Sequence, residues 1–221
     1  MTKESSIPRL ILKTGLFISV LLAINAACAA EPFKYVSKES RDCNNIAKQV
    51  KYVRPKIKGF KDYFNIRFGP YTVRVPPGFD KISGSMDMGS FFIKYPNNKL
   101  IAITSSLSYS RLIFKGIDTN QYPEILFMKT MCDELPKKAA DQEFWEAAFI
   151  DKKNVFNGSG TAMMTTDKRL TYYISDYKAG GFIGRAHIVD SVTEEAYLIL
   201  EARGFSYKDF KNIALNVTTG N

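Results

Sequence analysis

The sequence predicts an α+β domain, in which an antiparallel β-sheet of about six or seven strands is covered by helices. Three observations support this fold class. Runs that alternate apolar and polar residues, typical of strands, begin at residue 64. Apolar residues then recur at helical spacing between residues 122 and 149, and strand-like runs return after residue 160 before a final helix. Strands, helices, strands and a last helix, in that order, favour α+β over alternating α/β.

The first 30 residues have the three parts of a secretory signal peptide. Positive charge comes first, from Lys3, Arg9 and Lys13. An uncharged run from residue 14 to residue 30 follows, and its small Ala-Cys-Ala-Ala end suits a signal peptidase. We expect residues 1–30 to be removed, which would leave residues 31–221 in the bacterial periplasm or outside the cell.

Two alternatives to cleavage remain open. The run could stay as an anchor, although a spanning helix needs roughly 20 predominantly apolar residues. Cys28 could instead carry a lipid, since Ala26 and Ala27 precede it as in bacterial lipoproteins, but Asn25 stands where those signals have an aliphatic residue. The second alternative describes a lipid-anchored structural protein of the envelope.

Residues 31–61 are predicted to form an N-terminal basic segment with a short helix, because Cys43, Ile46, Ala47 and Val50 share helical spacing. Six basic residues and no acidic one occur between residues 48 and 61: Lys48, Lys51, Arg54, Lys56, Lys58 and Lys61. The whole chain carries a net charge of +9. We expect this segment to bind another envelope protein with an acidic face. An anionic membrane surface is the alternative partner. The segment could also be a solvated basic surface that only aids solubility. Nucleic acid is not expected as a partner of an exported protein.

Export also bears on whether the cysteines are oxidised. Without Cys28 the chain keeps only Cys43 and Cys132, and an oxidising compartment favours a disulfide between such a pair. The alternative is two reduced, buried thiols that behave as small apolar side chains.

The domain from residue 62 to residue 221 begins with two hairpins. "FNIRF" and "YTVRV" alternate apolar with polar or basic residues on either side of Gly69-Pro70. "SFFIKY" and "LIAITSSL" lie on either side of the turn-forming residues 96–99. Both pairs are predicted to form antiparallel strands.

The middle of the chain is predicted to be helical. One helix is expected over residues 122–136, where Ile125, Met128, Cys132 and Leu135 fall on one stripe, so that Cys132 points inward. A second helical piece follows at residues 139–149. Strands return with a tight hairpin at Asp167-Lys168. The last helix starts near Ser206, whose spacing to Asp209 resembles a capping box.

A strand that ends in Val75-Pro76-Pro77-Gly78-Phe79, a helical middle, a hairpin return and a terminal helix with Phe210 and Ile213 together resemble the PsbP-like superfamily. That superfamily includes bacterial envelope proteins of the DcrB type. The resemblance covers most of residues 31–221 and implies an accessory or binding protein without enzymatic activity. Its motifs are short, and they carry no set of functional residues across to this chain.

The residue inventory offers little for catalysis. His187 is the single histidine, and in "GRAHIVD" it is expected to be a half-buried or edge residue that shares a strand face with Arg185 and Val189. Glu143 and Glu146 lie one helical turn apart, as on the solvated side of a helix. No zinc spacing, calcium loop or phosphate-binding glycine motif is present. We therefore expect no enzyme, no catalytic residue, no metal and no cofactor.

The predicted function is an exported, non-enzymatic binding or accessory protein of the bacterial envelope, for example an inhibitor or immunity-like protein that neutralises an acidic toxin. The alternative is a periplasmic hydrolase that uses carboxylates or His187.

Overall fold

The structure is a computed structural model of the 221-residue chain. It describes residues 47–52, 63–85, 89–106, 119–130, 132–156, 161–176, 180–193 and 197–219. All of these belong to the second of two units into which the chain divides, Asp42–Asn221. The predicted signal peptide, Cys28 and Cys43 lie outside the described residues, so the expectations placed on them stay predictions.

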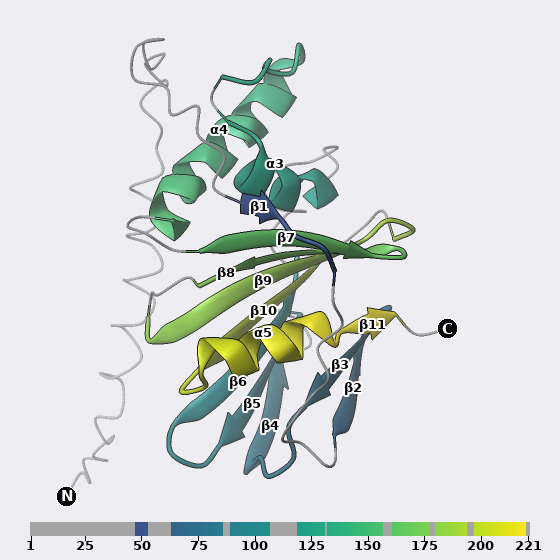
Figure 1. Ribbon diagram of the computed structural model, residues 1–221, viewed down its shortest axis with the longest axis vertical. Helices are drawn as coiled ribbons and strands as arrows, with labels where there is room; N and C mark the ends of the chain where they lie inside the picture. Colours follow the sequence, from purple (N-terminus) through teal and green to yellow (C-terminus); the bar gives the residue numbers. More distant parts are fainter. Residues whose placement is uncertain are drawn as a thin grey trace, which may run out of the picture. The chain divides into compact units, whose positions relative to one another are not determined.

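The larger of the two sheets has eight strands in the order β1-β7-β8-β9-β10-β6-β5-β4 (Figure 1), and every neighbouring pair except β1–β7 is antiparallel. Its strands are β1 (Ala47–Gln49), β4 (Lys81–Ser85), β5 (Ser90–Tyr95), β6 (Lys99–Ser105), β7 (Ala162–Asp167), β8 (Leu170–Ser175), β9 (Phe182–Asp190) and β10 (Leu198–Arg203). The predicted antiparallel sheet with covering helices, an α+β fold, is confirmed.

Residues 47–49 do not form the helix that the sequence predicts. Ala47–Gln49 was expected to continue a short helix, but it forms the strand β1 and pairs in parallel with β7. The Val50 N–H continues this pairing with a hydrogen bond of 3.0 Å to the Met164 carbonyl. A free sheet edge supplies backbone partners that the apolar spacing of the segment could not reveal. Part of the predicted N-terminal segment therefore belongs to the sheet.

The first hairpin lies in a second, smaller sheet of order β11-β3-β2. Its strands are β2 (Phe64–Phe68), β3 (Tyr71–Val75) and β11 (Thr218–Thr219). Gly69 turns the chain between β2 and β3 with a φ of 56°, a conformation that glycine adopts without strain. The predicted hairpin is thus confirmed, but its sheet is separate from the large one.

The two hairpin turns expected within the large sheet are also present. Asn97 and Asn98, with φ of 59° and 58°, connect β5 to β6. Two consecutive residues with positive φ match the right-handed twist of the strands they join, and asparagine tolerates that conformation. Lys168, with φ of 54°, connects β7 to β8 in the same region of backbone space.

One face of the large sheet packs against α5 (Tyr207–Leu215) and the small sheet. Ser206 caps α5 as predicted, since its hydroxyl accepts a hydrogen bond of 3.1 Å from the Asp209 N–H. Gly184 of β9 lets this helix approach closely, because a Cβ atom there would lie 2.3 Å from the Phe210 ring. The largest fully buried side chains of this layer are Tyr172, Phe210, Ile93, Ile101, Ile103, Ile174, Ile188, Leu198 and Leu200.

The opposite face is covered at the β7–β8–β9 end by α3 (Tyr122–Met128) and α4 (Ala139–Val155), which lie on the other side of the sheet from α5 (Figure 1). A single-turn 3-10 helix, η2 (Thr119–Gln121), precedes α3. Leu126 and Phe127 of α3 pack on Tyr173 of β8.

The helix expected over residues 122–136 was too long. It ends at Met128, because Lys129 is extended and Thr130 and Asp133 form a side-chain-closed turn. Polar side chains that bond the backbone in this way compete with helical hydrogen bonding. Cys132 consequently lies on an exposed loop and does not point inward.

Candidate binding surface

The basic segment predicted to bind a partner is only partly described. Lys48 lies in β1, and Lys51 follows it with an exposed side chain. The other four predicted contact residues lie outside the described residues: Arg54, Lys56, Lys58 and Lys61. The structure therefore places the beginning of the segment and not its cationic end.

Strand β1 and the side chain of Tyr52 fix the chain just before those four cations. β1 attaches it to the edge of the large sheet. Tyr52 then stacks on Tyr172 with ring centroids 5.9 Å apart and planes 20° from parallel. The Tyr52 hydroxyl also donates a hydrogen bond of 3.4 Å to the Leu215 carbonyl at the end of α5. The segment therefore leaves the domain from a fixed point.

On the far side of those cations the chain returns as β2. Asn65 and Arg67 of β2 lie opposite Arg74 and Thr72 of β3, on the sheet face that does not join the core. None of these four residues is acidic, and Asn65 and Arg67 are exposed. The six-cation segment is thus followed directly by a strand pair whose outer face is polar and positively charged.

A second group of cations, which the sequence analysis did not identify, lies at the β4 end of the large sheet. Lys81 lies directly opposite Lys94, Lys94 opposite Leu100, and Leu100 opposite Arg203. We call Lys81, Lys94 and Arg203 the basic row. The three residues are far apart in the sequence, so only the strand register brings them onto one face, and all three are exposed.

His187 is more deeply buried than the half-buried position expected for it. Its side chain on β9 is 2% exposed, under α3 and beside β10. Tyr122 and Tyr197 lie nearly parallel to the imidazole, with centroids 6.2 Å and 5.5 Å away, and Phe127 meets it edge-on at 5.7 Å. Neither ring nitrogen has a hydrogen-bond partner among the described residues.

Burial of the imidazole, assisted by the nearby positive charge of Arg185, lowers the pKa of His187 to about 3. The ring is therefore neutral at physiological pH. A base this weak, enclosed by aromatic rings, is badly suited to accept a proton from a substrate.

Charged groups border this aromatic cluster. Arg185, which shares the strand face as expected, makes an ion pair of 2.7 Å with Glu201 on β10. The Tyr122 hydroxyl donates to the Asp151 carboxylate on α4. Burial and the Asp151 charge raise the pKa of Tyr122 well above its usual value, so the phenol stays protonated. The first contact joins β9 to β10, and the second joins α3 to α4.

The carboxylates considered for hydrolysis are not gathered into a site. Glu143 is exposed on α4 and Glu146 is half-buried one turn further along. Within the described ranges, no three His, Cys, Asp or Glu side chains come close enough together to hold a metal ion.

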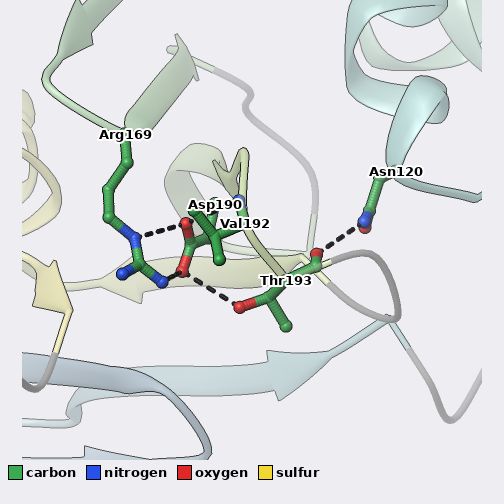
Figure 2. Close-up of polar contacts among 5 residues, drawn as sticks. All are labelled: Asn120, Arg169, Asp190, Val192 and Thr193. Carbon is green, nitrogen blue, oxygen red and sulfur yellow. Dashed lines mark hydrogen bonds and ion pairs between the residues drawn. The ribbon is translucent and has the colours of Figure 1, made fainter.

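Arg169 and Asp190 form a network that ties the β7–β8 turn to the end of β9 (Figure 2). The Asp190 side chain is 0% exposed and accepts hydrogen bonds from Arg169, from the Val192 N–H at 3.1 Å and from the Thr193 hydroxyl at 3.0 Å. Burial works to raise the pKa of Asp190, but these donors outweigh it and hold the pKa below its usual value. Asn120 extends the network by donating to the Thr193 carbonyl at 2.8 Å.

Cys132 is a disulfide-bonded cysteine. Its N–H donates to the Thr130 hydroxyl at 3.3 Å, within the turn that Thr130 and Asp133 close. Cys28 and Cys43 both lie outside the described residues, so the pairing of Cys132 with Cys43 stays a prediction.

The chain matches no protein-family model, no curated protein and no solved structure. The PsbP-like resemblance accordingly stays a prediction. Among the helices of the described residues, none has the length and apolar content needed to cross a bilayer.

Proposed function

We propose that this chain is an exported, non-enzymatic binding protein of the bacterial envelope, which holds an acidic partner protein. The contact is made by the basic segment, with Lys48, Lys51, Arg54, Lys56, Lys58 and Lys61. An inhibitor or immunity-like role towards an acidic toxin is one form of this function, and the PsbP-like resemblance is part of the same proposal.

The observation that supports it most is the attachment of the basic segment on both sides. β1 and Tyr52 fix the chain before the four remaining cations, and β2 begins immediately after Tyr63. A chain segment whose two flanking residues are fixed loses less conformational freedom on binding than a free tail. The neighbouring Arg67 and Arg74 add positive charge without an opposing acid on the same sheet face.

The same structure counts against the hydrolase alternative. A hydrolase that used His187 would need a titratable imidazole within reach of a substrate, and this one is 2% exposed with a pKa near 3. The described residues do not test the lipid-anchored alternative, because Cys28 lies outside them.

A charge-reversal experiment tests the proposal. Lys51, Lys56 and Lys58 are replaced by glutamate in one variant, and the exposed Lys137, Lys138 and Lys208 in a matched control. Each protein is used to isolate envelope proteins, which are identified by mass spectrometry. We expect an acidic protein retained by the wild type and the control to be lost with the first variant. Equal retention by both variants would remove the segment from the contact.

The compartment is tested separately. Intact mass of the protein purified from the envelope should correspond to a start near residue 31. A mass increment of a diacylglycerol on Cys28 would instead establish the lipid-anchored form.

A further inference from the structure

The strand β4 is an edge of the large sheet. It pairs with β5 on one side, and no strand of the described residues lies on its other side. Such an edge presents unpaired backbone N–H and C=O groups, to which an extended segment of another protein can add as a further strand. Figure 1 shows β4 at the end of the sheet away from α3 and α4.

The two faces of β4 differ in chemistry. Lys81 and Ser83 point to the face that carries the basic row, and Ile82 points to the face that holds the main core, opposite Ile93. Ile82 is 43% exposed although Ile93 is completely buried. The apolar face of the sheet is therefore not fully covered at this edge.

A second apolar residue is exposed on the same side of the core. Phe64, at the start of β2, is 51% exposed, and its ring meets that of Phe79 edge-on at 4.9 Å. Phe79 lies on the connection that leads into β4 and contacts Tyr95 of β5 at 6.1 Å. Exposed apolar side chains thus occur both on the edge strand and at the start of β2.

The charges at this edge are unbalanced. Lys81 and Lys94 are direct cross-strand neighbours, an arrangement that destabilises a sheet when both residues carry the same charge. Neither makes an ion pair with a described residue. Glu201, in the adjoining row, is already bound to Arg185. Asp80, which lies just before β4, forms no ion pair with Lys81 or Lys94, both of which are described residues.

We propose that the free edge of β4 binds an extended segment of a partner protein as an added strand. The segment carries acidic side chains where it lies beside Lys81, whose cross-strand neighbour Lys94 adds to the positive charge, and apolar side chains where it lies beside Ile82. Such a segment would form hydrogen bonds with the edge backbone, bring negative charge to the paired lysines and cover the exposed isoleucine. Anionic lipid headgroups would account for the lysines alone.

The inference does not rest on the proposed function of residues 48–61, because the two surfaces share no residue. Failure of the charge reversal at Lys51, Lys56 and Lys58 would leave the β4 edge unaffected. Failure at the β4 edge would likewise leave the basic segment unaffected.

The probe is a fluorescein-labelled peptide of alternating valine and glutamate, added to the full chain at low salt. Lys81→Glu is compared with Lys137→Glu, an equal charge change on an exposed loop residue. We expect the peptide to bind the wild type, and Lys81→Glu to weaken binding about tenfold, a loss of the size that one charged contact supplies. Lys137→Glu should bind like the wild type, and a valine–lysine peptide should not bind.

Amide hydrogen exchange locates the peptide. Bound peptide should slow exchange along Lys81–Ser85, the range of β4. Equal weakening by both variants, protection elsewhere in the chain, or no binding would overturn the proposal. Binding of phosphatidylglycerol vesicles without binding of the peptide would overturn it too, and would assign the basic row to lipid headgroups.

Discussion

Acidification should destabilise this fold through His187 in particular. The imidazole has a pKa of about 3 in the folded protein against 6.5 for the unperturbed side chain, because it is fully buried beside Arg185. The folded state therefore binds the proton less tightly than the unfolded state. The stability associated with a neutral His187 is complete above about pH 6.5 and is lost as the pH falls towards 3.

The magnitude follows from the two pKa values. At about pH 5 the unfolded histidine is almost fully protonated while the folded one is not, which lowers the free energy of unfolding by about 2 kcal/mol relative to pH 7.5. His187→Phe removes this contribution. The new ring packs against Tyr122, Phe127 and Tyr197 and leaves no nitrogen unpaired, so we expect the variant to be about as stable as the wild type at pH 7.5.

The assay is urea unfolding of both proteins at the two pH values. Carboxylates that titrate in this range contribute equally to both proteins, so the difference between the two pH effects isolates His187. We expect the wild type to lose about 2 kcal/mol more than the variant. An equal loss in both proteins, or an imidazole proton resonance that titrates near pH 6.5 in the folded wild type, would refute the reasoning.

Four further outcomes are expected. Gly184→Ala should lower the free energy of unfolding, measured in urea, by at least about 2 kcal/mol, because its Cβ would lie 2.3 Å from the buried Phe210 ring. An unchanged free energy of unfolding would mean that α5 can move away. Arg169→Ala should cost about 1–3 kcal/mol, because the buried Asp190 carboxylate loses its ion pair and keeps its neutral donors, whereas Lys168→Ala beside it serves as a control for the turn. Ser206→Ala should lower the free energy of unfolding by about 1 kcal/mol by removing the cap of α5, measured as a shift in thermal midpoint, and Ser206→Thr, which keeps the hydroxyl, should restore most of it. Mass spectrometry of proteolytic fragments before and after reduction should recover Cys132 linked to Cys43, and a link to Cys28 would contradict both that pairing and signal-peptide removal.

The hairpins were predictable because their signals are local. Residues 96–99 and Asp167-Lys168 combine turn-forming residues with flanking runs of strand type, and the structure uses them as turns. The capping of α5 by Ser206 was likewise readable from spacing. These elements need no information about distant parts of the chain.

The errors arose where distant contacts decide the structure. Ala47–Gln49 has helical spacing in the sequence but is a strand, because β7 offers its edge more than a hundred residues later in the chain. The helix at Tyr122 ends early because Thr130 and Asp133 close a turn there, and the Lys152 ammonium group donates to the Lys129 carbonyl from the next helix.

The candidate sites divide in the same way. The basic segment at residues 48–61 was visible as a run of letters. The basic row was not, since Lys81, Lys94 and Arg203 become neighbours only through the register of β4, β5, β6 and β10. The depth of His187 depends on α3 covering its strand, which strand alternation alone does not specify.

The strand order has a consequence for how the polypeptide reaches its native state. β4–β5–β6 and β7–β8–β9–β10 are two meanders whose pairings are each sequence-local, and they meet only where β6 joins β10, with Ile103 opposite Leu200. Pairing β6 with β10 brings together positions almost a hundred residues apart. The chain loses entropy when this long loop closes, before the side chains of β6 and β10 are buried. We therefore expect each meander to assemble early and their union to be the slow step of folding, which refolding kinetics of a variant at Ile103 or Leu200 would test.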